Sequence, residues 1–146
     1  SLNNISQIKL FNFGFYSSDK TLVELNDNPT NSGMYYYLEN KQKDTDLKKI
    51  KFIVADDFIE ENSLDSIDVI KIDVEGAEYH VLLGLKNYLS KADPTIHIEI
   101  DHAALRKFDS SLDEIIRLLK ECEFKIFEKI NYENDNNHYD MVCRKN

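Results

Sequence analysis

The stretch that decides the fold is "VIKIDVEGAEYHVLLGL", Val69–Leu85. Its first residues form a nearly continuous apolar run that is interrupted only by Lys71. Such a run is typical of a strand buried on both faces of a parallel sheet. From Gly76 the apolar residues recur at helical spacing. The stretch therefore predicts a strand, an acidic turn and a helix, and the acids of the turn are Asp73, Glu75 and Glu78.

The segment after this helix predicts a second strand. Apolar and polar residues alternate strictly in "TIHIEI", Thr95–Ile100, as in a strand. A strand, a helix and a second strand form a βαβ unit with parallel strands. We therefore expect Val69–Asp73 to be a central parallel strand with Thr95–Ile100 beside it. Ser111 and Glu114 then have the spacing of a capping box that begins another helix.

The remaining patterns predict further strands on either side of this unit. The chain from residue 35 to residue 49 reads as a solvated excursion, and a short helix is expected through about Asn62. The last two strands are expected to form an antiparallel hairpin around an Asn-rich loop. The predicted strands are Ile8–Phe15, Thr21–Leu25, Ile50–Phe58, Phe124–Ile130 and Tyr139–Lys145.

Length, charge and cysteine content limit the classes of protein to which the chain can belong. The chain has 146 residues, which suits one α/β domain. Its net charge of −9 disfavours nucleic acid and anionic membranes as partners. No run approaches the ~20 apolar residues that span a membrane. Two widely separated cysteines, Cys122 and Cys143, imply no disulfide framework, so the reducing cytoplasm is the expected location.

Acidic side chains follow both central strands at their carboxyl ends. Ligands of open parallel sheets bind beyond these ends, and Asp73 and Glu99 lie there on adjacent strands. Such acids can hold a hard cation, accept hydrogen bonds from hydroxyls or act as a general base. His102 follows as a second candidate base. Taken singly, Glu75 and Glu78 fit better as first-turn acids that complement the helix dipole, and His102 fits at least as well as a residue at a helix start.

The stretch "IDVIKIDVEGAEYHVLLGLKNYL", residues 67–89, resembles the signature of the FkbM-type methyltransferase family. Two further segments resemble the family more loosely. The resemblance implies a class I methyltransferase (Rossmann-like) sheet, S-adenosylmethionine as cofactor, and transfer of a methyl group to a hydroxyl of a sugar, polyketide or other small metabolite. The two looser segments are "FNFGFYSSDKTLVEL" at residues 11–25 and "KFIVADDFIEEN" at residues 51–62.

The resemblance also implies roles for individual residues. The catalytic candidates are Asp73, Glu75, Glu99 and His102. The cofactor-binding candidates are Ser18, or Ser17 in its place, together with Asp19 and Asp73. The substrate-binding candidates are Glu78 and Tyr36. A divalent metal is compatible with these acids but is not predicted.

Members of this family have an earlier half, with a Gly-rich turn for the cofactor and a strand whose acid binds the ribose. No two of the four glycines here form a Gly-x-Gly. Residues 1–146 are therefore expected to form a single domain that is the C-terminal portion of the methyltransferase domain. We expect this portion alone to be inactive and to bind cofactor weakly or not at all. We also expect it to form homodimers or aggregates through an exposed sheet edge unless residues 26–49 cover that edge.

Three other classes of protein remain open. A non-catalytic α/β binding module fits the missing cofactor residues. A receiver-like phosphoacceptor domain fits "KFIVADD" and "DVIKID", but only 16 residues (57 to 73) separate its two acidic positions. A metal-dependent hydrolase would need a tighter set of histidines and aspartates. Apart from a second copy of the chain, the expected partner is a small-molecule or glycan acceptor.

Overall fold

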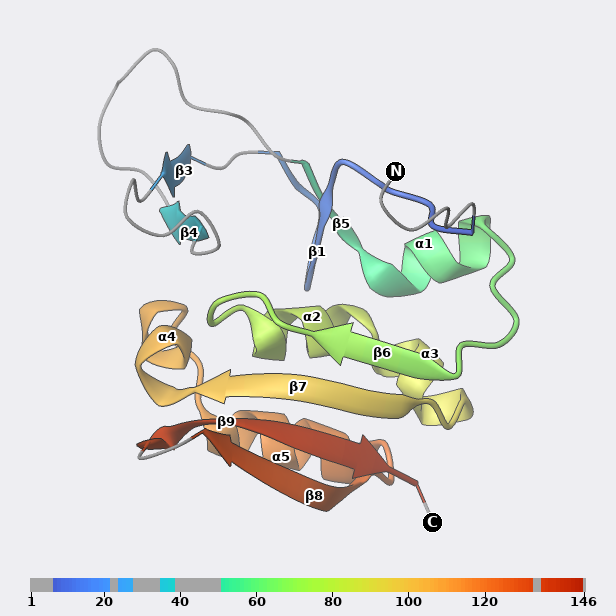
Figure 1. The fold of residues 1–146 in the computed structure, drawn as a ribbon. Helices are drawn as coiled ribbons and strands as arrows, with labels where there is room; N and C mark the ends of the chain where they lie inside the picture. The colour runs from blue at the N-terminus through green and yellow to red at the C-terminus, as the bar shows by residue number, and fades with distance from the viewer. Residues whose placement is uncertain (1–6, 22–23, 28–34, 39–50, 133–134, 146) are drawn as a thin grey trace.

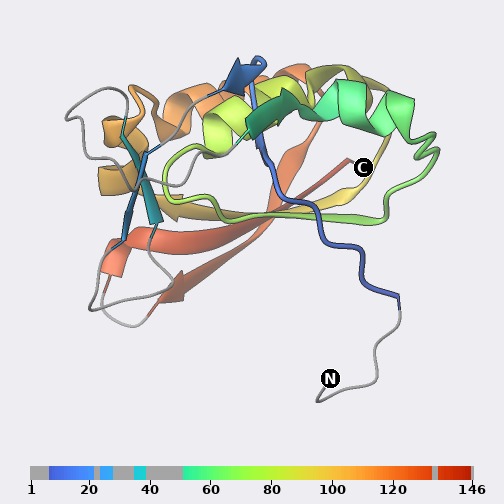
Figure 2. The same ribbon diagram turned by 90° about the horizontal axis from the view of Figure 1, so that it is seen from above.

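The largest unit is a four-stranded mixed sheet with helices on one face (Figures 1 and 2). The first two strands in the sheet are parallel, and the other pairs are antiparallel. In spatial order the strands are β6 (Val69–Ile72), β7 (Thr95–Asp101), β9 (Asp135–Arg144) and β8 (Lys125–Tyr132). The computed structural model describes residues 7–21, 24–27, 35–38, 51–132 and 135–145, with side chains for 7–19, 51–132 and 136–145.

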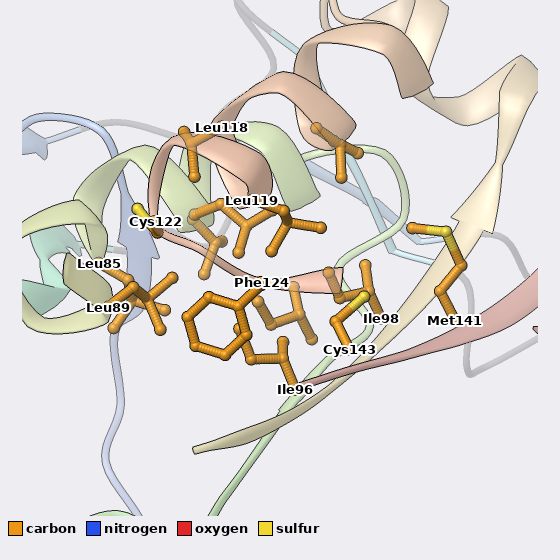
Figure 3. Close-up of a cluster of buried hydrophobic side chains, with 14 of the residues drawn as sticks. Leu85, Leu89, Ile96, Ile98, Leu118, Leu119, Cys122, Phe124, Met141 and Cys143 are labelled. Carbon is orange, nitrogen blue, oxygen red and sulfur yellow. The ribbon is translucent and has the colours of Figure 1, made fainter. Parts of the chain in front are cut away.

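The helices bury one face of this sheet because β7 alternates as its sequence predicts. Ile96, Ile98 and Ile100 are fully buried, whereas the residues between them are only partly buried. The close-up in Figure 3 shows Ile96 and Ile98 in one cluster with leucines of the helix layer, Phe124 and Met141. The covering helices are α2 (Glu78–Gly84), α3 (Lys86–Lys91), α4 (His102–Lys107) and α5 (Leu112–Glu121).

Ser111 is confirmed as the N-cap of α5, and Glu114 bonds its hydroxyl rather than its backbone N–H. The backbone N–H of Glu114 donates to Ser111 Oγ at 3.4 Å, and the Ser111 hydroxyl donates to Glu114 Oε2 at 2.7 Å. The Ser111 bond satisfies an N–H group that the helix itself leaves unpaired.

A second, smaller sheet packs against the outer side of α2. Gly84 allows this close approach, because a Cβ there would lie 2.3 Å from the backbone oxygen of Tyr16. Asp56 joins the same region to α3 by accepting the backbone N–H groups of Asn87 and Tyr88 at 2.9 and 2.8 Å. This sheet has the order β1 (Gly14–Tyr16), β5 (Lys51–Val54), β2 (Lys20–Thr21), and α1 (Ala55–Glu61) follows β5.

The α/β class and the C-terminal hairpin are confirmed, but the predicted place of Val69–Asp73 is wrong for the described part of the chain. There β6 pairs with β7 alone and is an edge strand. The reason is that β1 takes β5 as its parallel neighbour and packs on α2 instead of pairing with β6. Among the described helices, none is long and apolar enough to cross a membrane.

Several predicted element boundaries also differ. The predicted strand Ile8–Phe15 is reduced to β1, and the predicted strand Ile50–Phe58 ends at Val54, where α1 begins. Part of the expected excursion at 35–49 is strand, since β3 (Glu24–Asp27) pairs with β4 (Tyr35–Leu38). Residues 28–34 and 39–50 lie outside the described part.

Candidate functional site

The acidic turn after β6 has a backbone that few sequences can adopt. Glu75 and Gly76 both have positive φ angles, 55° and 110°. A Cβ on Gly76 would lie 2.4 Å from the backbone oxygen of Ala104, so only glycine fits here. The turn thus brings the end of β6 into contact with α4, which directly follows β7.

The Glu78 side chain stabilises this turn through hydrogen bonds to its backbone. Its Oε1 accepts the backbone N–H groups of Val74 and Gly76 at 3.1 and 3.0 Å, one on each side of Glu75. The side chain is only 2 % exposed, and burial raises the pKa of its carboxyl. This placement gives Glu78 a defined part in shaping the turn and leaves it little surface for contact with a substrate.

Three of the predicted acids converge above the turn. Carboxylate oxygens of Asp73, Glu75 and Glu99 all lie within 4.8 Å of one another. Burial, and next the charge of Asp73, raises the pKa of Glu75. Burial also raises the pKa of Glu99, with Asp73 adding to the rise and His138 opposing it. The cluster of Asp73, Glu75 and Glu99, which we call the acid cluster, therefore favours a bound proton or cation.

The basic groups beside the acid cluster come from two directions. Lys71 on β6 places its Nζ 3.3 Å from Asp73 Oδ2. His138 on β9 places its Nε2 2.8 Å from Glu99 Oε1. Sequence reasoning gave His138 no partner, although the alternation of His138, Asp140 and Val142 along β9 was a signal that they share one face.

The polar face continues from His138 along β9. The Tyr132 hydroxyl donates to Asp140 Oδ2 at 3.1 Å, and His97 Nε2 lies 3.1 Å from the same oxygen. Desolvation and the Asp140 carboxylate raise the pKa of Tyr132 to about 12. Histidines, carboxylates and a tyrosine thus occupy the sheet face opposite the described helices.

Asp101 and His102, at the end of β7, point elsewhere. Asp101 caps α4 by accepting the backbone N–H groups of Ala103 and Ala104 at 2.7 and 3.2 Å. His102 is the first residue of α4, and its ring centroid lies 6.0 Å from that of buried Tyr139. The structure does not bring His102 into the acid cluster, so its catalytic role stays a prediction.

The predicted cofactor residues Ser18 and Asp19 lie on an exposed turn after β1. Asp19 Oδ1 accepts the backbone N–H of Val54 at 3.3 Å. The turn is anchored to α2, because Tyr16 stacks on His80 at 4.3 Å between centroids and Ser17 Oγ lies 3.4 Å from His80 Nδ1. The side chain of Tyr36 is outside the described part of the chain.

The chemistry that the acid cluster can perform follows from its carboxylate oxygens. Three carboxylates offer oxygen ligands of the kind that Mg²⁺ and Ca²⁺ prefer. The same oxygens can orient a hydroxyl by accepting its hydrogen bond, and the Glu99–His138 pair can take up a proton from it.

The comparison with known protein families identifies the class of this domain. The model of the methyltransferase FkbM domain matches residues 13–126, which include β1, the acidic turn and β7. The chain therefore belongs to the FkbM methyltransferase domain family. Neither the curated proteins nor the solved structures that were searched contain a match to it.

Proposed function

We propose that this domain contributes the acceptor side of an S-adenosylmethionine-dependent O-methyltransferase. The observation that carries the proposal is the convergence of Asp73, Glu75 and Glu99 beyond the ends of two parallel strands, within a chain of the FkbM methyltransferase family. When bound, S-adenosylmethionine supplies an electrophilic methyl group. The acceptor oxygen forms a bond to the methyl carbon, the carbon–sulfur bond breaks, and the hydroxyl proton must leave.

The residues of this chain fit the proton side of that reaction. Asp73 orients the acceptor hydroxyl by accepting its hydrogen bond. Glu99, whose pKa is raised and whose Oε1 is bonded to His138, receives the proton and shares it with the imidazole. A divalent cation held by the acid cluster would serve the same purpose by lowering the pKa of a bound hydroxyl.

The cofactor is assigned to the side of the acid cluster where the turn after β1 is anchored to α2. Ser18 and Asp19 are the proposed contacts to the adenine end, and the His80–Tyr16 stack holds their turn against α2. This part of the proposal is supported by the match of residues 13–126 to the family. A small polyol, sugar or polyketide is the proposed acceptor.

The two cysteines are unpaired, which is their usual state in a reducing compartment. Cys122 and Cys143 are free and buried, and burial raises the pKa of Cys143 to about 11. A thiol in that state is protonated and is not a reactive thiolate. We propose the cytoplasm as the location.

The test is methyl transfer by the polypeptide that carries this domain. S-adenosylmethionine labelled in the methyl group is incubated with a panel of sugars and hydroxylated small molecules, with and without Mg²⁺. Label in an ether-linked methyl group supports the proposal. Cofactor binding without transfer to any hydroxyl identifies a binding module, and transfer to nitrogen or carbon rejects the O-methyl assignment.

A further inference from the structure

Five polar side chains form a continuous line of contacts across β7, β9 and β8, on the sheet face opposite the described helices. His97 Nε2 lies 3.1 Å from Asp140 Oδ2, and the Tyr132 hydroxyl donates to the same oxygen at 3.1 Å. The Tyr132 ring lies against the His138 imidazole with 4.7 Å between the ring centroids. His138 Nε2 in turn lies 2.8 Å from Glu99 Oε1, so the line begins and ends on β7.

Asp140 occupies a position that is unfavourable for a carboxylate. It is only 8 % exposed, and its Oδ1 has no hydrogen-bond partner among the described residues. The register of β7 and β9 places it directly opposite Glu99, so two carboxylates face each other. Burial and a facing like charge both disfavour an ionised side chain at this position. The value of Asp140 therefore lies in the contacts of its Oδ2.

One of these contacts fixes the side chain of Tyr132. Tyr132 is the last residue of β8 and is 41 % exposed, so packing restrains only part of its ring. The pairing of β8 with β9 shifts between Asn131 and Tyr132, so the strand ladder does not fix the direction of the side chain either. The hydroxyl bond to Asp140 therefore determines where the ring lies, and the ring lies against His138.

We propose that Asp140 and Tyr132 are positioning residues that hold the His138 imidazole in place for its bond to Glu99. An ionised carboxylate only accepts hydrogen bonds, so His138 Nε2 carries the proton of that bond. The part of this inference that concerns catalysis rests on the proposed function, in which Glu99 shares the proton of the acceptor with His138. The geometric part rests on the contacts alone.

A second acid near His138 explains why the imidazole has to be held. The register places Asp101 directly opposite His138, which is within reach of a side chain across the strand pair. Asp101 already accepts the backbone N–H groups of Ala103 and Ala104 at the start of α4. An imidazole that turns toward Asp101 loses its bond to Glu99 and with it the connection to the acid cluster. The Tyr132 ring opposes that turn.

The test is the exchange of the His138 Nε2 proton with water, measured by ¹⁵N-edited NMR of the 146-residue chain at one fixed pH. Tyr132→Phe keeps the ring and removes its bond to Asp140, and it should speed the exchange about fivefold, as expected for one lost hydrogen bond. Asp140→Leu removes the acceptor and should have the same effect. Asp140→Asn keeps an oxygen that accepts from Tyr132, so it should preserve slow exchange. His138→Gln assigns the signal.

A double variant and a control separate this bond from other effects of the two residues. If Tyr132 and Asp140 act through their bond, the variant that carries both Tyr132→Phe and Asp140→Leu exchanges no faster than either single variant. Phe127→Leu is the matched control, because Phe127 is also an aromatic residue of β8, is 65 % exposed and contacts Arg144 instead of His138. It should leave the exchange unchanged.

Methyl transfer in the assay described above gives a second readout. Tyr132→Phe should lower kcat about fivefold and leave the KM of the acceptor unchanged, because His138 acts on the transferred proton and not on binding. Asp140→Asn should retain more of kcat than Asp140→Leu. Absence of transfer by the unmodified polypeptide rejects the proposed function, and the proton exchange then decides the geometric inference alone.

Four results would overturn the inference. The first is a His138 Nε2 proton that exchanges as fast in the unmodified chain as in Tyr132→Phe. The second is an equal effect of Asp140→Asn and Asp140→Leu, and the third is an additive effect in the double variant. The fourth is a change in Phe127→Leu as large as that in Tyr132→Phe. If Asp140→Leu does not fold, the contrast between Tyr132→Phe and Asp140→Asn still decides.

Discussion

Glu99 and His138 are 39 residues apart in sequence, and their side chains meet at 2.8 Å across the β7–β9 ladder. The register places Glu99 opposite Asp140 and His138 opposite Asp101, so the contact is diagonal between adjacent strands. On its other side Glu99 faces Asp73 and Glu75. The Glu99 carboxylate therefore lies between two acids and the His138 imidazole. From this position it can pass a proton from an acceptor hydroxyl to the imidazole.

The first prediction compares the effects of two acids of the turn on methyl transfer. Asp73→Asn should lower turnover ~10²–10⁴-fold, the usual loss for a positioned acid–base or cation-holding carboxylate. Glu78→Gln should cost less, because the amide oxygen can still accept the N–H groups of Val74 and Gly76. Turnover and melting temperature are measured for both variants. Near-normal turnover of Asp73→Asn with loss in Glu78→Gln would invert these roles.

The second prediction concerns pH and stability. Burial raises the pKa of Glu78 in the folded chain. The folded state therefore binds the proton of Glu78 more tightly than the unfolded state does. The stabilisation from this proton is present below the ordinary pKa of 4.5 and is lost as the pH rises through the folded pKa. Glu78→Gln should therefore gain stability relative to the unmodified chain between pH 4 and pH 8 in urea titrations. Glu128→Gln, an exposed residue of β8, is the control and should show no such trend.

The third prediction tests the close contact under the turn. Gly76→Ala should destabilise the chain by ~2 kcal/mol or more, because φ is 110° and the new methyl group meets backbone atoms of Ala104. Gly14→Ala is the comparison, since its methyl group meets the ring of Phe52, a side chain that can move. Equal losses in the two variants, measured by chemical denaturation, would contradict the role assigned to the turn backbone.

The fourth prediction concerns the cofactor. The 146-residue chain should bind S-adenosylmethionine weakly or not at all in a calorimetric titration, because its four glycines provide no Gly-x-Gly turn for the methionine end. A methyltransferase that has a Gly-x-Gly turn and binds S-adenosylmethionine is the positive control. Micromolar binding by the 146-residue chain would show that the cofactor site is misplaced.

Much of the fold could be predicted because its patterns were local. The alternation in Thr95–Ile100, the N-cap at Ser111 and the strand–turn–helix around Gly76 depend on nearest neighbours, and all three are present in the structure. The edge position of β6 depends instead on which strand pairs with which. An apolar run indicates that a strand is buried, but it does not indicate how many strands pair with it.

The candidate site was predictable in part for the same reason. Asp73, Glu75 and Glu99 follow from strand ends that are adjacent in a βαβ unit. His138 approaches from an antiparallel strand, and its contact depends on the register of β9 against β7. The β7–β9 register runs without a shift and the β8–β9 register shifts twice, and no local sequence pattern predicts either.

Glu78 bonds the backbone on both sides of Glu75 while having almost no surface of its own. The direction in which Glu75 points is thus decided by a residue that a ligand cannot touch. Substitution at position 78 can therefore change the acidity and orientation of the Glu75 carboxylate while it leaves the exposed surface of the site almost unchanged. A screen for altered acceptor preference in this domain should therefore include this buried position as well as the rim of the site.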